Sequence, residues 1–168
     1  MLRFAGSATV LAIGLCVAGV VGRAQGGLVT TKPAPVQSTE PKFDPARDAD
    51  QDIRAALAEA RRTHRRVILD VGGEWCGWCH ALDRYFVEHP DLRALREQSY
   101  VWVKVNFSPE NKNTAVLSRY PKINGYPHLF VLDQDGALVQ SQDTSLLEEG
   151  PSYNFERMKA FLTKWAGR

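Results

Sequence analysis

The sequence predicts an α/β fold in which helices cover both faces of a mixed sheet. Its apolar patterns alternate in the order helix, strand, helix, strand, helix, strand, strand, helix. A strand–helix–strand start favours a parallel strand pair, whereas the Asp135-Gly136 turn between the last two strands favours an antiparallel hairpin. A sheet that contains both kinds of pairing needs helices on both of its faces to form a core.

The first helix and the first strand are predicted from their apolar residues. Asp50 can cap a helix. The positions that would share the apolar face of that helix are Ile53, Ala56, Leu57 and Ala60. Residues 67–71 form an almost continuous apolar run, which is typical of a strand buried on both faces. Asp70 is the acid within this run, and Gly72 and Gly73 end it.

The middle of the chain predicts two more helical segments and a second strand. Residues 81–87 have apolar residues at helical spacing, and Pro90 begins a short helix. Residues 100–105 predict the second strand, and residues 108–120 predict a helical or irregular segment. Glu74, in the turn before the first of two close cysteines, is expected to be solvated.

The last third of the domain predicts a hairpin, a loop and a final helix. Residues 128–132 form the third strand, and the fourth lies around residues 137–139. The polar residues 144–153 predict a loop, and a helix is expected from about Asn154. Its residues at helical spacing, which we assign to the core, are Phe155, Met158, Phe161, Leu162 and Trp165.

Residues 1–24 have the pattern of an export signal. Arg3 supplies positive charge, residues 8–21 are small or apolar, and Ala24 ends a stretch that a signal peptidase can cleave. The run is too short and too rich in glycine and alanine for a membrane-spanning helix, which needs about 20 strongly apolar residues. We therefore predict a cleaved signal and a periplasmic or secreted protein, with an uncleaved N-terminal membrane anchor as the alternative.

Residues 25–47 predict a flexible, proline-rich linker, and the folded domain is then expected over residues 48–168. Cleavage after Ala24 would remove Arg3 and Arg23 from the 21 basic residues, which leaves 19 against 19 acidic residues. A neutral chain without a basic cluster gives no reason to expect nucleic acid as a partner.

Cys76 and Cys79 belong to the most specific motif of the chain, Trp-Cys-Gly-Trp-Cys-His over residues 75–80. Two cysteines at this spacing can form a disulfide, but the loop that it closes is too small to stabilise a fold. A redox-active disulfide therefore explains the pair better than a structural one. With His80, the same pattern also fits the attachment of a c-type haem. The second haem ligand would then be Met158, His64, His89 or His128. Strands on both sides of the motif favour the redox interpretation, and no cofactor or metal is expected.

Cys76 is predicted to be the nucleophile, because it precedes a helix whose free N–H groups stabilise a thiolate. Cys79, one turn later, is then the resolving thiol that displaces the product from a mixed disulfide. Asp70, in a strand that is otherwise apolar, is expected to relay the proton of Cys79 through a water molecule. The alternative is that Asp70 caps a nearby N–H group or lies at the edge of the strand.

Residues 70–79 (Asp-Val-Gly-Gly-Glu-Trp-Cys-Gly-Trp-Cys) resemble the active-site strand and turn of the thioredoxin family. Residues 125–127 (Gly-Tyr-Pro) resemble the cis-proline loop of that family, and residues 103–106 resemble its central strand. The Asp135-Gly136 turn is similar to that of its terminal hairpin. The resemblance spans about residues 48–168, and it implies a three-layer fold with a mixed central sheet of roughly four to five strands.

The resemblance implies an exported thiol:disulfide oxidoreductase that acts on the thiols and disulfides of protein substrates. It assigns catalysis to Cys76, Cys79 and Asp70, substrate binding to Trp75, Tyr126 and a cis Pro127, and tuning to Gly77, Trp78 and Lys104. A membrane thiol donor or acceptor is the expected redox partner, and a reductase is favoured over an oxidase. A binding or delivery module with the same fold and little turnover is the alternative.

Two features depart from the family pattern. Trp78 stands where reducing thioredoxins have a proline, so the reduction potential cannot be transferred from them. Gly72 and Gly73 stand where bulkier residues are usual, and we expect this to open the surroundings of the sulfur.

Overall fold

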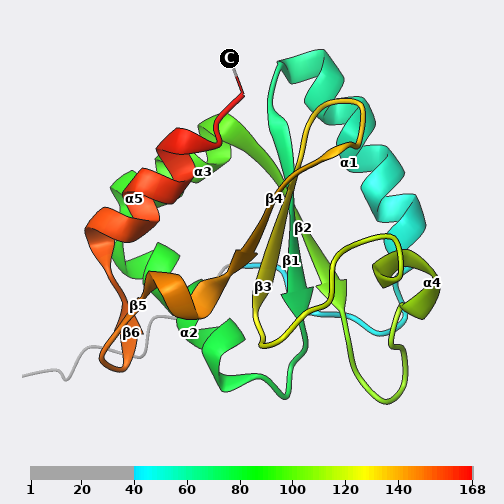
Figure 1. Cartoon of the computed structure of the whole chain (residues 1–168), viewed down its shortest axis with the longest axis horizontal. Coiled ribbons are helices and arrows are strands. Elements are labelled where there is room, and N and C mark those ends of the chain that lie inside the picture. Colours follow the sequence, from blue (N-terminus) through cyan, green and yellow to red (C-terminus); the bar gives the residue numbers. More distant parts are fainter. Residues whose placement is uncertain (1–39, 168) are drawn as a thin grey trace, which may run out of the picture. The chain divides into compact units, whose positions relative to one another are not determined.

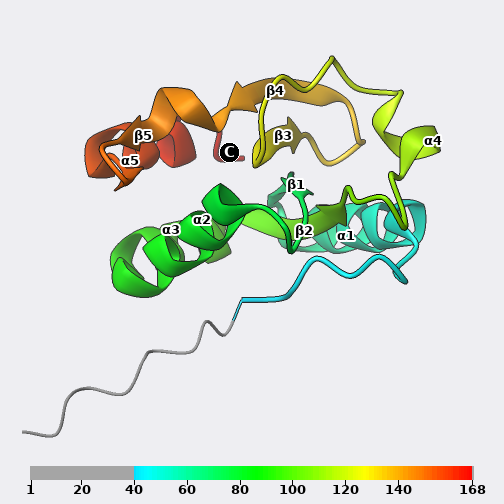
Figure 2. The same ribbon diagram turned by 90° about the horizontal axis from the view of Figure 1, so that it is seen from below.

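A four-stranded mixed sheet forms the centre of residues 40–167, the part of the chain that the computed structural model describes. The strands are β1 (Arg66–Gly72), β2 (Tyr100–Asn106), β3 (His128–Leu132) and β4 (Leu138–Asp143), in the spatial order β2-β1-β3-β4. β1 is parallel to β2 and antiparallel to β3, and β3 is antiparallel to β4. Figure 2 shows this order across the sheet. The predicted mixed α/β sheet is therefore confirmed.

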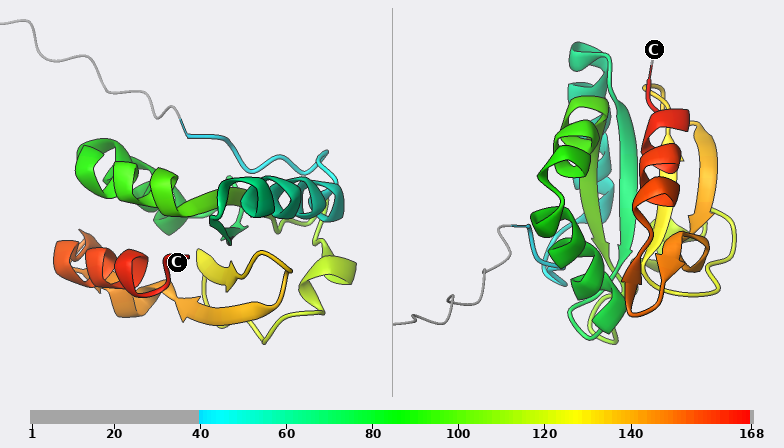
Figure 3. Two further views of the ribbon diagram at one scale, coloured as in Figure 1. Left: turned by 90° about the horizontal axis from the view of Figure 1, so that it is seen from above. Right: turned by 90° about the vertical axis from the view of Figure 1, so that its left-hand side faces the viewer.

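Helices cover both faces of the sheet, as the sequence predicts. Helix α1 (Ala49–Thr63) lies on one face, and α2 (Gly77–Glu88), α3 (Pro90–Ser99) and α5 (Phe155–Lys164) lie on the other (Figure 1). Helices α3 and α5 pack side by side (Figure 3). The cap of α1 is Asp48 rather than Asp50, because the Asp48 carboxylate accepts hydrogen bonds from the N–H groups of Asp50 and Gln51. Within residues 40–167, no helix combines the length and the apolarity needed to cross a membrane.

The alternation of side chains along β1 decides which residues face the cysteine helix. Val67, Leu69 and Val71 pack in the core cluster that contains the apolar face of α1. Ile68 packs in the opposite cluster with residues of α2, α3 and α5. Because successive side chains of a strand point to opposite faces, Asp70 and Gly72 share the face of Ile68. The acid predicted in this strand therefore lies on the same side of the sheet as α2.

Between Ser108 and Tyr120, the structure contains the short helix α4 (Thr114–Leu117), preceded by Asn113 in the left-handed region at φ 46°, which agrees with the predicted helical or irregular segment. The predicted polar loop over residues 144–153 instead contains the 3-10 helix η1 (Thr144–Leu147) and a small hairpin of β5 (Glu148–Glu149) and β6 (Ser152–Tyr153). This segment is ordered because Leu147 and Tyr153 are buried in the core beside α5.

Residues 40–47, which the sequence assigns to the flexible linker, pack against the domain. The Phe43 side chain is buried, with 2% of the residue exposed. The Glu40 carboxylate forms a buried ion pair with Arg96 of α3 at 2.9 Å. The boundary near Asp48 therefore places the start of the packed structure too late.

Candidate active site at the Cys76–Cys79 disulfide

Cys76 and Cys79 lie where β1 leads into α2, and they are joined by a disulfide bond with their Cα atoms 5.2 Å apart. Cys76 is the N-cap residue of α2. Its Sγ accepts a hydrogen bond from the backbone N–H of Cys79 at 3.1 Å. The partial positive charge at a helix N-terminus favours a thiolate at this position when the disulfide is reduced.

Gly72 and Gly73 allow a close approach of side chains to the active-site strand, rather than opening the site. A Cβ atom on Gly72 would collide with the Sγ of Cys79 and would lie 3.1 Å from Cζ of Phe43. A Cβ atom on Gly73 would collide with the Trp75 ring and lie 2.9 Å from the carbonyl oxygen of Phe107. The expected open surroundings are therefore wrong, because sulfur and aromatic rings fill this space.

Aromatic side chains surround the outer side of the disulfide. Trp75 is the most exposed of them at 56%, and its Nε1 donates a hydrogen bond to the carbonyl oxygen of Phe107 at 2.7 Å. The Trp75 and Tyr126 rings meet edge to face, with their centroids 5.5 Å apart. Tyr126 also stacks on Phe107, and the bond between Tyr126 and Pro127 is cis. The structure thus brings together three residues that the sequence predicts for substrate binding.

Trp78 lies on the inner side of α2 and contacts the hairpin that the sequence did not predict. Its ring meets Tyr153 edge to face at 5.7 Å, and the Tyr153 hydroxyl donates a hydrogen bond to the Trp78 carbonyl oxygen at 3.2 Å. The residue that replaces the usual proline is therefore held by β6.

Three charged side chains are buried on the α2 face of the sheet. Lys104 of β2 pairs in register with Asp70, and its Nζ lies 3.3 Å from Oδ2 of Asp70. The same Nζ lies 2.7 Å from Oδ1 of Asp83, a residue of α2 that the sequence analysis did not select. Trp102 Nε1 donates a hydrogen bond to Oδ2 of Asp70 at 3.2 Å. Asp83 could have been found from its spacing, because it follows Cys79 by four residues on the same face of a helix.

Burial and ion pairing shift the pKa values of these charged groups in opposite directions. Burial raises the pKa of Asp83, and the nearby Lys104 ammonium only partly offsets this effect. Burial also acts to lower the pKa of Lys104, but the carboxylates of Asp70 and Asp83 outweigh it and leave that pKa above its usual value. Lys104 is therefore charged at neutral pH, and its charge is shared between two carboxyl groups.

The residues considered for haem attachment take part in the packing of the fold. The Nε2 atom of His80 lies 2.8 Å from the carbonyl oxygen of Glu74. Met158 is fully buried in the core, and Nε2 of the buried His128 lies 2.8 Å from the Ser141 hydroxyl. Burial also lowers the pKa of His128. The His89 ring packs in a tilted arrangement against the rings of Tyr85 and Phe155.

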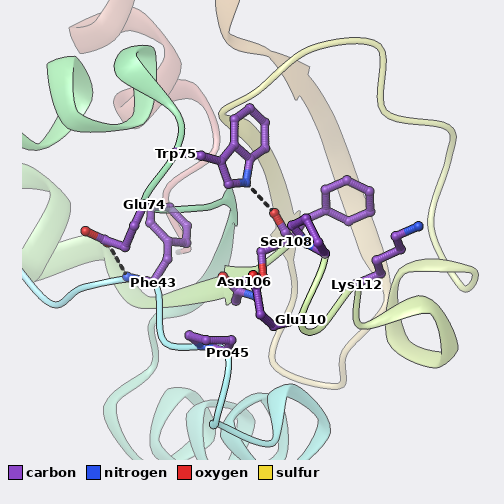
Figure 4. Close-up of a pocket in the computed structure, with 10 residues that line it drawn as sticks. Phe43, Pro45, Glu74, Trp75, Asn106, Ser108, Glu110 and Lys112 are labelled. Carbon is purple, nitrogen blue, oxygen red and sulfur yellow. Dashed lines mark hydrogen bonds between the residues drawn. The ribbon is translucent and has the colours of Figure 1, made fainter.

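A pocket of about 610 Å³ lies beside Trp75 (Figure 4). Its apolar walls are formed by Phe43, Pro45, Trp75, Phe107 and Pro109. Polar groups at its rim include Glu110 and Lys112. The pocket therefore lies next to the exposed ring that flanks the disulfide, and residues 40–47 form one of its sides.

Comparison with known proteins identifies the family. A family model described as thioredoxin-like matches residues 48–134, so the chain belongs to the thioredoxin-like family. It is 31% identical over 88 residues to the thiol:disulfide interchange protein DsbE of Pseudomonas aeruginosa, covering 52% of this chain and 44% of that protein. It is 23% identical over 101 residues to the thiol:disulfide interchange protein DsbD of Pseudoalteromonas atlantica, covering 60% of this chain and 17% of that protein. The chain thus spans less than half the length of these two curated relatives.

Solved structures agree with this assignment. The disulphide isomerase from Xylella fastidiosa Temecula1 superposes with a TM-score of 0.63 at 26% identity, over 73% of this chain and 94% of that one. The oxidised C-terminal domain of Neisseria meningitidis DsbD shares the fold, with a TM-score of 0.51 at 19% identity, over 73% of this chain and 98% of that one. Together with the disulfide of Cys76 and Cys79, these matches show a thioredoxin-like thiol:disulfide oxidoreductase. The predicted family and enzyme class are confirmed.

We predict that Gly72→Ala destabilises the oxidised protein, because the new methyl group would overlap the Sγ of Cys79. Overpacking of this kind costs about 1–3 kcal/mol. In the reduced protein the thiol can rotate away, so the loss should be smaller, and the disulfide should become easier to reduce. Urea unfolding of both redox forms measures the difference.

The matched control is Gly77→Ala, since a Cβ atom on Gly77 has no atom within 4 Å and lies at the start of α2. This variant should leave the free energy of unfolding unchanged or raise it slightly. Equal losses in the two variants, or equal losses in both redox forms of Gly72→Ala, would contradict the close approach as the cause.

Proposed function

We propose that this protein reduces disulfide bonds in protein substrates outside the cytoplasm, with Cys76 as the nucleophile and Cys79 as the resolving thiol. The observation that carries the assignment of roles is the position of Cys76 at the N-terminus of α2, where its Sγ accepts an N–H hydrogen bond. Cys79 lies one turn further along, against the backbone of β1, and 1% of this residue is exposed compared with 4% of Cys76. These positions support attack by the first sulfur and resolution by the second.

The reaction begins with the reduced enzyme. The Cys76 thiolate attacks one sulfur of a substrate disulfide, which forms a mixed disulfide and releases one substrate thiolate. Cys79 then loses its proton and attacks the Sγ of Cys76, so that the enzyme disulfide forms and the second substrate thiolate leaves. Two electrons pass from the enzyme dithiol to the substrate in these steps. A thiol donor, for which we propose a membrane protein, must then reduce the enzyme again.

We propose that Asp70 accepts the proton of Cys79 through a water molecule. It lies two residues before Gly72 on the same face of β1, and the missing side chain of Gly72 leaves the space that Sγ of Cys79 occupies. Oδ2 of Asp70 is engaged by Trp102 and Lys104, whereas Oδ1 accepts no hydrogen bond from residues 40–167. This second oxygen is therefore the one that can bind a proton or a bridging water.

The buried charged side chains also favour electron flow from the enzyme to its substrate. Two carboxyl groups, those of Asp70 and Asp83, face the single Lys104 ammonium, so the group holds one more acidic than basic side chain. A negative field disfavours a thiolate and therefore favours the disulfide form of the pair. A pair that prefers to be oxidised is a donor of electrons to its substrate, as a reductase requires.

We expect an extended segment of the substrate protein to lie across Trp75, Tyr126 and Pro127. Trp75 presents an exposed ring beside the disulfide, and Tyr126 links it to Phe107. An extended chain bound there could form backbone hydrogen bonds with the loop of Tyr126, in the manner of strand addition. The named relatives are thiol:disulfide interchange proteins, which is consistent with protein substrates.

We predict that Cys79→Ser traps substrates as mixed disulfides through Cys76, because the resolving thiol is absent. The trapped amount should exceed that of Cys76→Ser by about tenfold or more. Non-reducing electrophoresis, followed by mapping of the linked peptides, measures both variants. If Cys76→Ser traps substrates equally well, the two roles are assigned wrongly.

The same assay tests Asp70. With both cysteines present, Asp70→Asn should slow the release of substrate from the mixed disulfide by about tenfold to a hundredfold. The amide retains an oxygen for the Trp102 hydrogen bond, and Lys104 retains Asp83, so the fold should persist. Unchanged release in a folded variant would show that Asp70 is not the proton acceptor, and a variant that unfolds would show that Asp70 is structural.

The proposed compartment rests on the export pattern of residues 1–24. When the full chain is expressed in a bacterium, we expect the mature protein outside the cytoplasm with Ala24 as the last residue removed. Mass spectrometry of fractionated cells identifies the new N-terminus. An intact chain in the membrane fraction would support the anchor instead, and an intact chain in the cytoplasm would contradict export.

A further inference from the structure

Residues 40–47, here called the N-terminal strap, are held against the active site by several polar contacts. The Glu40 carboxylate pairs with the buried Arg96, and the backbone N–H of Phe43 donates to Oε1 of Glu74 at 2.8 Å (Figure 4). Further along, the Asn111 side chain donates to the carbonyl oxygen of Pro45 at 2.9 Å. The strap precedes residues 48–134, which match the family model.

Glu74 connects the strap to the catalytic turn itself. It lies between Gly73 and Trp75, two residues before Cys76, and its side chain is about half exposed. Glu74 is exposed, as the sequence predicted, and its carboxylate also accepts the Phe43 hydrogen bond. The strap is therefore joined by a hydrogen bond to the turn that carries the cysteines.

Phe43 is the residue that the strap inserts. Its ring edge and the Sγ of Cys79 crowd the same point, the position that a Gly72 side chain would occupy. Its ring face lies 4.0 Å from Nζ of Lys104, which is within the range of a cation–π contact. Phe43, Cys76 and Cys79 form a small buried cluster of their own, packed against Trp78 and Tyr126. The ring thus packs beside the inner sulfur and the Lys104 ammonium, both of which are buried.

We propose that Phe43 is a positioning residue that seals Cys79 from external thiols, so that exchange with other molecules takes place at Cys76. The inference rests on the proposed roles of Cys76 and Cys79. Without the seal, an external thiolate could attack the Sγ of Cys79. The enzyme disulfide would break, Cys76 would leave as a thiolate, and the mixed disulfide would form at the inner sulfur. The proposed substrate-binding residues on the outer side of the disulfide would not reach a mixed disulfide at that position. The strap therefore determines which sulfur reacts.

Alkylation of single thiols tests this seal. In the full chain carrying Cys76→Ser, Cys79 is the thiol of the site, and in Cys79→Ser it is Cys76. Adding Phe43→Ala should raise the rate at which iodoacetamide modifies Cys79 by about tenfold or more, and that of Cys76 by less than about twofold. Peptide mapping locates the modified cysteine.

The controls separate a local seal from general loosening of the fold. Phe43→Leu keeps apolar cover without the aromatic ring and should restore slow alkylation of Cys79. Phe161→Ala removes a buried aromatic ring from α5 and should leave the ratio of the two rates unchanged. If Phe161→Ala raises the alkylation of Cys79 as much as Phe43→Ala does, the seal is not specific and the proposal is wrong.

A second pair of variants tests the strap without changing Phe43. Glu74→Ala removes the acceptor of the Phe43 hydrogen bond and should speed the alkylation of Cys79, whereas Glu74→Gln keeps an acceptor oxygen and should not. This pair also provides the test if Phe43→Ala does not fold. Unchanged alkylation of Cys79 in both Phe43→Ala and Glu74→Ala would overturn the seal. Substrate trapping by Cys79→Ser would in that case still support Cys76 as the nucleophile and Cys79 as the resolving thiol. Equal trapping by Cys76→Ser would overturn the roles themselves.

Discussion

The close approach of Cys79 to the backbone of β1 at Gly72 is the constraint on which the rest of the site depends. Because Gly72 has no side chain, α2 can bring the inner sulfur against the strand. The alternation of β1 then places Asp70 on the same face, two residues away. The remaining space beside the sulfur is filled by Phe43 from the N-terminal strap. One glycine thus allows the disulfide, the buried acid and the strap to share a small volume.

The buried charges are held by mutual pairing. Removing an ion from water is costly, and the cost is recovered only when its partners satisfy it closely. Lys104 meets Asp70 and Asp83, and Trp102 adds a hydrogen bond to Asp70. The group still holds one more acidic than basic side chain, and Oδ1 of Asp70 has no hydrogen-bond partner within residues 40–167. An arrangement chosen for stability alone would not need this excess, whereas the proposed proton transfer from Cys79 and the proposed reducing disulfide would both make use of it.

Apolar periodicity predicted the four strands and the main helices, because burial on a sheet face leaves a clear local pattern. The pairing of Asp70 with Lys104 was available from the family resemblance, since the two lie in register on adjacent strands. Asp83 was missed although its helical spacing from Cys79 indicates it. The strap could not be predicted, because its prolines and polar residues are typical of a linker and Phe43 is buried by contacts distant in sequence. The hairpin at residues 148–153 was missed for the same reason, as Leu147 and Tyr153 are ordered by the core.

The reduction potential of the Cys76–Cys79 pair tests most directly the claim that the excess of acidic side chains beneath it makes this enzyme a reductase. It can be measured at pH 7 from the fraction of oxidised protein in a series of thiol–disulfide buffers. The account predicts a value close to that of thioredoxin, about −270 mV, and a higher value when Asp70 is replaced by asparagine. A wild-type value near that of strong oxidants, about −120 mV, would contradict it and make the protein a donor of disulfides.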